Sequence, residues 1–220
     1  MTKLLYAVAA LTAMLGCASG AAPAGQRALR PVEGRVLTSA EKPAVRLEFA
    51  EGFRYAGGQE FILYDVAHAE QHFFVDADAA GKVKRLYWVQ FEGYLPDNTH
   101  AYDYDSPTKV EIGGLEFFAD AFPVSTAGPE QRPDSDGARA RAFLTSKGYK
   151  MAGDELMMQR LVHLLDEKKR DELMIIYAES LDGTGLDAAS LKPGGRAAAR
   201  WPDLSKGLLE RATKGVRITR

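Results

Sequence analysis

The chain has 220 residues and a net charge of −2, with 46% hydrophobic and 26% charged residues. This composition is typical of a globular protein, excludes a largely disordered one, and gives enough chain for one domain with a sizeable core. Positive and negative residues are mixed along the sequence, so no basic patch favours binding to nucleic acid or electrostatic attachment to a membrane.

The N-terminus has the pattern of a secretory signal peptide. Lys3 supplies one positive charge, an uncharged and mostly apolar run occupies residues 4–15, and small residues follow. This run is too short to span a bilayer, so we expect residues 1–16 to be removed on export. Because their only charge is Lys3, the remaining chain has a net charge of −3. The sequence thus predicts an exported protein of the cell envelope, facing the periplasm.

Leu15-Gly16-Cys17 resembles the lipobox of bacterial lipoproteins, although Met14 stands where that family usually carries leucine. The resemblance covers only the leader. It implies that Cys17, the single cysteine, is acylated and tethers the protein to a membrane without spanning it. The alternative is cleavage after the small residues 18–22, which would leave a soluble secreted protein. In both cases no disulfide can form within one chain.

Residues 17–43 are rich in Ala, Gly and Pro and lack periodicity, which predicts a flexible tether. We expect a single α+β domain over residues 44–220. Its first strand is predicted at residues 45–49, where apolar and charged residues alternate, and the next at the β-favouring residues 60–66.

The clearest hairpin in the sequence joins residues 70–76 to residues 82–92 through the turn at 78–81. If the turn closes at its terminal Asp and Gly, Phe74 lies opposite Arg85. Apolar residues occupy both faces of this hairpin. We therefore expect one face to pack against helices and the other to line a cavity or meet another layer.

The remaining expected elements are, in chain order, a turn-rich loop at 93–108, strands at 110–112 and 115–122, helices at 136–147 and 154–168, a strand at 173–178, a Gly- and Ala-rich loop at 181–200, and a helix from Pro202 that Gly215 ends. The order predicts an α+β fold. Its core would be a curved antiparallel sheet of about five to seven strands packed with two to three helices.

Aromatic residues of the hairpin and of the loop 93–108 are the candidate ligand-binding residues, because small-molecule sites combine aromatic walls with a few polar groups. They are Phe74, Tyr87, Trp88, Phe91, Tyr102 and Tyr104. The alternative is that the loop tyrosines bury their rings and anchor the loop.

A second candidate site is His68-Ala-Glu70-Gln-His72, in which a strand would place two imidazoles and a carboxylate on one face. These groups suit Zn²⁺ or a similar divalent metal, with His100 or Asp76 as a further ligand. Three ligands on one straight strand converge poorly, so ordinary solvated histidines are the alternative.

No sequence pattern for nucleophilic catalysis or phosphate binding is present, and a carboxylate pair among Glu60, Glu70 and Glu92 rests on their approximate spacing alone. We therefore expect a non-enzymatic, membrane-anchored protein that binds a small hydrophobic or amphipathic molecule. A metal-binding protein and a structural or interaction protein of the envelope are the alternatives.

Overall fold

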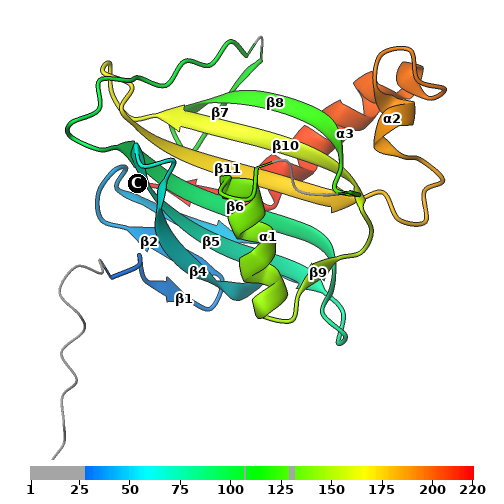
Figure 1. Ribbon diagram of the computed structural model, residues 1–220, viewed down its shortest axis with the longest axis horizontal. Coiled ribbons are helices and arrows are strands. Elements are labelled where there is room, and N and C mark those ends of the chain that lie inside the picture. The colour runs from blue at the N-terminus through cyan, green and yellow to red at the C-terminus, as the bar shows by residue number, and fades with distance from the viewer. Residues whose placement is uncertain (1–27, 107, 129–131) are drawn as a thin grey trace, which may run out of the picture.

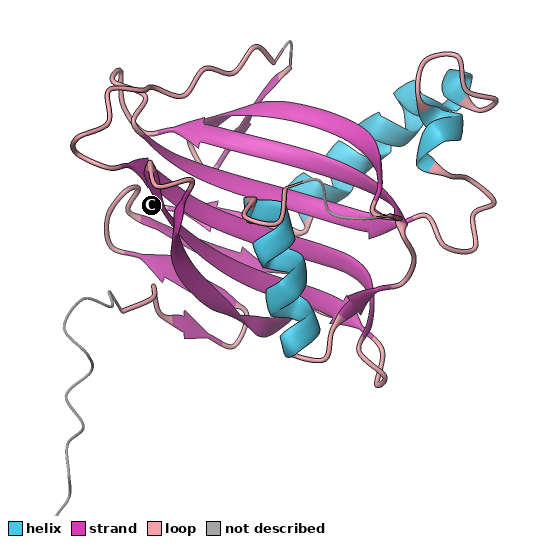
Figure 2. Ribbon diagram, in the orientation of Figure 1, coloured by secondary structure: helices cyan, strands magenta, loops and turns pink. Residues whose placement is uncertain are grey.

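A computed structural model describes residues 28–106, 108–128 and 132–220 of the chain. Within these ranges the protein is mostly β-structure, with two largely antiparallel sheets and three α-helices (Figures 1 and 2). The expected combination of antiparallel sheet and helices is confirmed in this coarse form. The larger sheet has more strands than expected, and helices occupy less of the chain.

The larger sheet has eight strands, and the chain runs through most of it by antiparallel neighbours. Its strands, in spatial order, are β4 (Arg54–Leu63), β5 (Ala67–Ala77), β6 (Lys82–Tyr94), β11 (Asp171–Ser180), β10 (Glu155–Leu164), β8 (Leu115–Ser125) and β7 (Lys109–Ile112), with β9 (Lys150–Met151) pairing in parallel with β6. The smaller sheet has the order β1 (Val32–Glu33), β2 (Val36–Ser39), β3 (Val45–Phe49) and β12 (Val216–Thr219).

The large sheet is covered on both faces, because side chains along each strand alternate between two apolar layers. On the front face, Leu86 and Trp88 pack toward helix α1 (Asp136–Ser146). On the back face, Tyr87 and Val89 pack toward the smaller sheet and helix α3 (Trp201–Lys214). Figure 1 shows α1 and α3 on opposite sides of the sheet.

The predicted hairpin is confirmed as β5 and β6, but its register is two residues away from the expected one. Phe74 lies opposite Tyr87, not Arg85, and the pairing shifts between Asp76 and Ala77. This irregularity beside the turn accounts for one residue of the difference. Because a slip of two residues preserves the alternation, the side chains before the irregularity lie on their expected faces, whereas Val83 beyond it lies in the front core.

The helix predicted at 154–168 is wrong, since these residues form strand β10 between β8 and β11. The apolar residues of this segment resembled a wide helical stripe. In the structure they divide between two faces, with Leu161 in the back core and Val162 in the front core. A strand that is buried on both faces shows no alternation of apolar and polar residues, which explains the error.

The tether predicted at 17–43 is wrong for its second half. Residues 32–39 form β1 and β2, so the ordered region begins before residue 44. Leu37 is fully buried in the back core. The predictions for residues 1–16 and for Cys17 lie outside the described residues. No helix in the described part of the chain has the length and apolarity needed to cross a bilayer.

The two remaining predicted helices are confirmed. α1 begins after Ser135, whose hydroxyl accepts a hydrogen bond from the amide of Ala138, and α3 ends at Gly215. The loop expected at 181–200 contains the short helix α2 (Ala188–Leu191), with a capping box at Asp187, and a single 3₁₀ turn (Ala198–Arg200).

Candidate functional site

A cavity of about 530 Å³ lies between α1 and the front face of the large sheet. Its walls are mainly apolar and come from five elements, α1, β6, β8, β9 and β10. The apolar lining includes Leu86 and Trp88 of β6, Ala140 and Leu144 of α1, and Leu156 and Met158 of β10.

The position of α1 explains why this space exists. Hydrogen bonds from Gln59 to the carbonyl of Arg139 (3.1 Å) and from Gln71 to that of Asp136 (3.2 Å) hold the helix over β4 and β5. The Phe143 ring also stacks on Phe73 of β5, with centroids 5.3 Å apart. The cavity lies on the other side of the helix, over β6 and β10.

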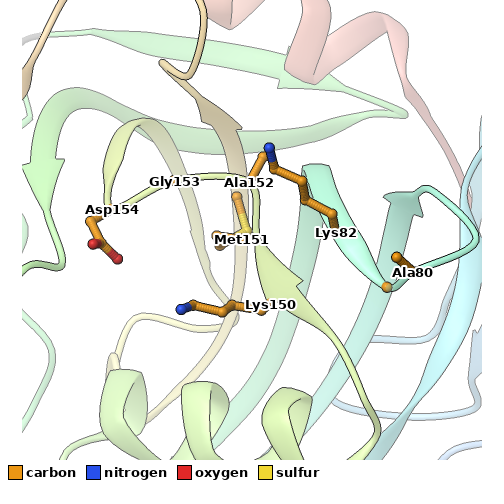
Figure 3. Close-up of a pocket in the computed structure, with 8 residues that line it drawn as sticks. Ala80, Lys82, Lys150, Met151, Ala152, Gly153 and Asp154 are labelled. Carbon is orange, nitrogen blue, oxygen red and sulfur yellow. The ribbon is translucent and has the colours of Figure 1, made fainter.

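The mouth of the cavity is polar. Thr126, Arg141, Thr145, Lys150 and Asp154 line it, and Arg141, Thr145, Lys150 and Asp154 are exposed to solvent. A second, more polar pocket of about 350 Å³ has some of the same lining residues, and Figure 3 shows the residues around it. Lys150, Met151 and Asp154 line both spaces, so the two spaces share this wall.

Trp88 connects the cavity to a buried polar chain on the same face. Its indole nitrogen donates a hydrogen bond to Gln90 Oε1 (3.2 Å), which also accepts one from Gln71 Nε2 (2.8 Å). Gln90 in turn donates to the carboxylate of Glu92. Because buried amides need hydrogen-bond partners, this chain fixes the orientation of Trp88 and Gln90.

Glu92 lies directly opposite Glu172 in the pairing of β6 with β11. Tyr102 donates to Glu92 and Tyr104 donates to Glu172, each over 2.7 Å. Burial raises the pKa of both carboxyls, and burial together with the charge of Glu92 raises the pKa of Glu172 to about 8. Glu172 therefore keeps its proton at neutral pH.

The six predicted ligand-binding residues do not meet in one pocket, because they belong to opposite faces of the sheet. Phe74, Tyr87 and Phe91 lie in the back core, where Phe74 stacks on Phe49 with centroids 3.9 Å apart. Trp88, on the front face, lines the cavity under α1. Phe91 borders a separate hollow of about 230 Å³.

Tyr102 and Tyr104 hold the loop against the sheet, which is the alternative role considered for them. Beyond their bonds to the two glutamates, the amide of Tyr102 donates to the carbonyl of Lys169 over 2.7 Å. Arg170 also donates to the carbonyls of Leu95 and His100. The loop is thus fastened to the end of β11 and does not border the cavity under α1.

The residues of the predicted metal site share one face, as expected, but their polar atoms bind other protein groups. Glu70 accepts hydrogen bonds from the backbone amide and the guanidinium of Arg30 and contacts His72 Nε2 at 2.8 Å. His72 Nδ1 lies 2.9 Å from the hydroxyl of Tyr55. Glu70 and His72 are fully buried. Arg30, Glu70, His72 and Tyr55 thus form a continuous hydrogen-bond chain on the back face.

His68 does not join this chain. Its Nε2 lies 3.2 Å from Glu60, and about a third of its side chain is exposed. His100 contacts the Tyr94 ring, and Asp76 pairs with Arg85. In the part of the chain that the structure describes, no cluster of three or more His, Cys, Asp or Glu side chains is arranged to hold a metal ion.

The three glutamates considered as a carboxylate pair, Glu60, Glu70 and Glu92, are divided in the same way. Glu60 lies directly opposite Glu70, but Glu92 lies on the other face and pairs with Glu172. Sequence reasoning missed Glu172, and the apolar residues after it gave the available signal. A carboxyl group that adjoins a fully buried strand is removed from water together with that strand.

The cavity residues of α1 and β10 were also missed. Leu156 and Met158 were assigned to a helix, whereas they lie in strand β10 of the same sheet as Trp88. Comparisons of the chain with protein-family models, curated proteins and solved structures found no match. The chemistry of the cavity itself is therefore the basis for a functional assignment.

Proposed function

We propose that this protein binds a small hydrophobic or amphipathic molecule, without converting it chemically, in the cavity between α1 and the large sheet. The observation that carries the proposal is a cavity of about 530 Å³ with an apolar floor and a polar mouth. Ligand sites are typically concave, mainly apolar and in this range of volume, with a few polar groups that orient the ligand.

Binding of an apolar molecule in the cavity is expected to be energetically favourable. The side chains around an apolar space lose the dispersion contacts that a close-packed interior provides. Leu86, Leu144 and Leu156 face this space although each is less than 10% exposed. An apolar molecule would restore these contacts. Met158 lines the same wall, and its flexible thioether adapts to ligands of different shape.

Tryptophan fluorescence tests this binding directly, because one of the two tryptophans lines the cavity. The other, Trp201, packs against the back core, so the variant Trp201→Phe leaves Trp88 as the single reporter. We expect dodecan-1-ol to change the Trp88 emission in a saturable way. An emission that does not respond to dodecan-1-ol or to other single-chain amphiphiles would contradict the proposal.

A substitution on α1 tests whether the ligand occupies this cavity. Gly137 lines it, and a β-carbon there would meet no other heavy atom within 4 Å. We expect Gly137→Leu to weaken dodecan-1-ol binding about tenfold or more, because the larger side chain takes up ligand space, without loss of stability. The matched control is Gly137→Ala, which removes the same glycine but should keep most of the affinity. Equal affinity in both variants would place the ligand elsewhere.

We also propose that the protein is exported and anchored through an acylated Cys17. The support is the leader pattern and its resemblance to the lipobox. In a bacterial host that expresses the chain, tritiated palmitate should label the wild type but not Cys17→Ser. Labelling of neither protein would contradict acylation and would favour cleavage at residues 18–22.

A further inference from the structure

We infer that the bound molecule carries an anionic headgroup and that Lys150 binds it at the cavity mouth. This inference rests on the proposed binding function. It narrows the ligand class to a single-chain amphiphile that ends in a carboxylate.

Lys150 is placed where a headgroup would emerge from the apolar cavity. It begins β9 and lines both the cavity under α1 and the adjoining polar pocket. Figure 3 shows its side chain extending away from β9 above helix α1, toward the side on which Asp154 lies. A ligand whose chain lies against Trp88 and Leu144 would therefore present its polar end to this amine.

The backbone that carries Lys150 is held in place. Its amide donates to the carbonyl of Gly81 over 3.0 Å, and the amide of Ala152 donates to that of Val83 over 2.7 Å. These bonds add β9 to the long strand β6, whose side chains form the cavity floor. A charged group on a fixed strand loses less entropy on binding than one on a mobile loop.

The charges at the mouth favour an anion. Lys82 is paired with Asp182 at 3.0 Å, whereas no described residue forms an ion pair with the amine of Lys150. Asp154 lies across the mouth, and the hydroxyl of Thr126 is 3.5 Å from its carboxylate. Among the described residues, the amine of Lys150 is thus a positive charge at the mouth without an ion-pair partner.

The expected strength of this contact is modest, because Lys150 is exposed to solvent. Exposed ion pairs contribute little in water, but here one side of the pair adjoins an apolar wall that excludes water. We expect the headgroup contact to improve affinity about three- to tenfold. The apolar cavity supplies the rest of the binding free energy.

The test compares dodecanoate with dodecan-1-ol, using the Trp88 signal in the Trp201→Phe background below micelle-forming concentrations. With Lys150 in place, we expect the protein to bind dodecanoate more tightly than dodecan-1-ol. Lys150→Met should weaken dodecanoate about three- to tenfold and leave dodecan-1-ol unchanged. Added NaCl should reduce the affinity for dodecanoate alone. The matched control is Lys84→Met, which removes an exposed lysine of β6 outside the cavity lining and should change neither affinity.

Failure of this inference differs from failure of the proposed function. If both amphiphiles bind but Lys150→Met changes neither affinity, the cavity binds ligands and the headgroup assignment is wrong. If neither amphiphile binds the wild type, the proposed function itself fails. If Lys150→Met loses more affinity for dodecan-1-ol than for dodecanoate, the proposed role of Lys150 is also wrong.

Discussion

Replacing Glu172 with glutamine should raise the free energy of unfolding at pH 9 by about 3–5 kcal/mol, while leaving it nearly unchanged at pH 4. Glu172 is 3% exposed, and its pKa is raised from 4.5 to about 8 by burial and by the charge of Glu92. Urea denaturation of both proteins across this pH range measures the difference.

The direction follows from the protons bound in each state. Between pH 4.5 and about 8 the folded protein keeps the proton of Glu172, whereas the unfolded chain releases it. Unfolding therefore releases a proton, and stability falls as the pH rises. Burial also raises the pKa of Glu92 and of Asp136, so some slope remains in the variant. The hydrogen bond from Tyr104 and the positive charge of Arg160 both lower the pKa of Glu172, but burial outweighs them.

Glu111→Gln is the matched control, because Glu111 lies exposed on β7. It should leave the pH dependence of stability unchanged. If Glu172→Gln has the same slope as the wild type, or is less stable at every pH, Glu172 does not hold a proton in the folded protein.

Replacing Glu70 with alanine should lower the free energy of unfolding at pH 7 by about 3–5 kcal/mol. The Glu70 side chain is 2% exposed, and the Arg30 side chain that pairs with it is 12% exposed. Without the carboxylate, the Arg30 guanidinium loses its buried counter-charge and His72 Nε2 loses its partner. Circular dichroism during urea denaturation measures the loss.

The same carboxylate predicts a loss of stability in acid. Burial opposes ionisation of Glu70, but hydrogen bonds from His72 and Arg30 outweigh it and hold the pKa at about 2. The ionised carboxylate therefore stabilises the fold above pH 4.5, and this contribution is lost as the pH falls toward 2. We expect the difference between wild type and Glu70→Gln to shrink over that range.

Glu60→Ala provides a control for the buried site, since Glu60 lies directly opposite Glu70 and pairs with the part-exposed His68. Its effect should be less than about 1 kcal/mol. If Glu60→Ala and Glu70→Ala destabilise the protein equally, the chain from Arg30 to Tyr55 has no special role in stability.

Local patterns in the sequence were sufficient for elements with one exposed side or a clear boundary. Pro202 and Gly215 marked the two ends of α3, and alternation marked β3. The segment at 155–164 lacked such marks. Its apolar residues form two faces of a strand because β8 and β11 pair with it on either side. The local sequence pattern carries no information about these neighbouring strands.

The candidate site was accessible from sequence only in part. Trp88 was identified because the hairpin that carries it was clear. Its partners across the cavity come from α1 and β10, and their meeting depends on where α1 lies on the sheet. Gln59 and Gln71 set that position by donating hydrogen bonds to backbone carbonyls of the helix. Because every residue has a backbone carbonyl, no sequence motif marks these contacts.

Native mass spectrometry tests the central claim most directly, using the protein purified without refolding from the cells that produce it. We predict a bound molecule of about a few hundred daltons on the wild type and on Gly137→Ala, released by mild activation and depleted on Gly137→Leu. A chain without added mass in all three proteins, or an equal added mass on Gly137→Ala and Gly137→Leu, would contradict ligand binding between α1 and the sheet.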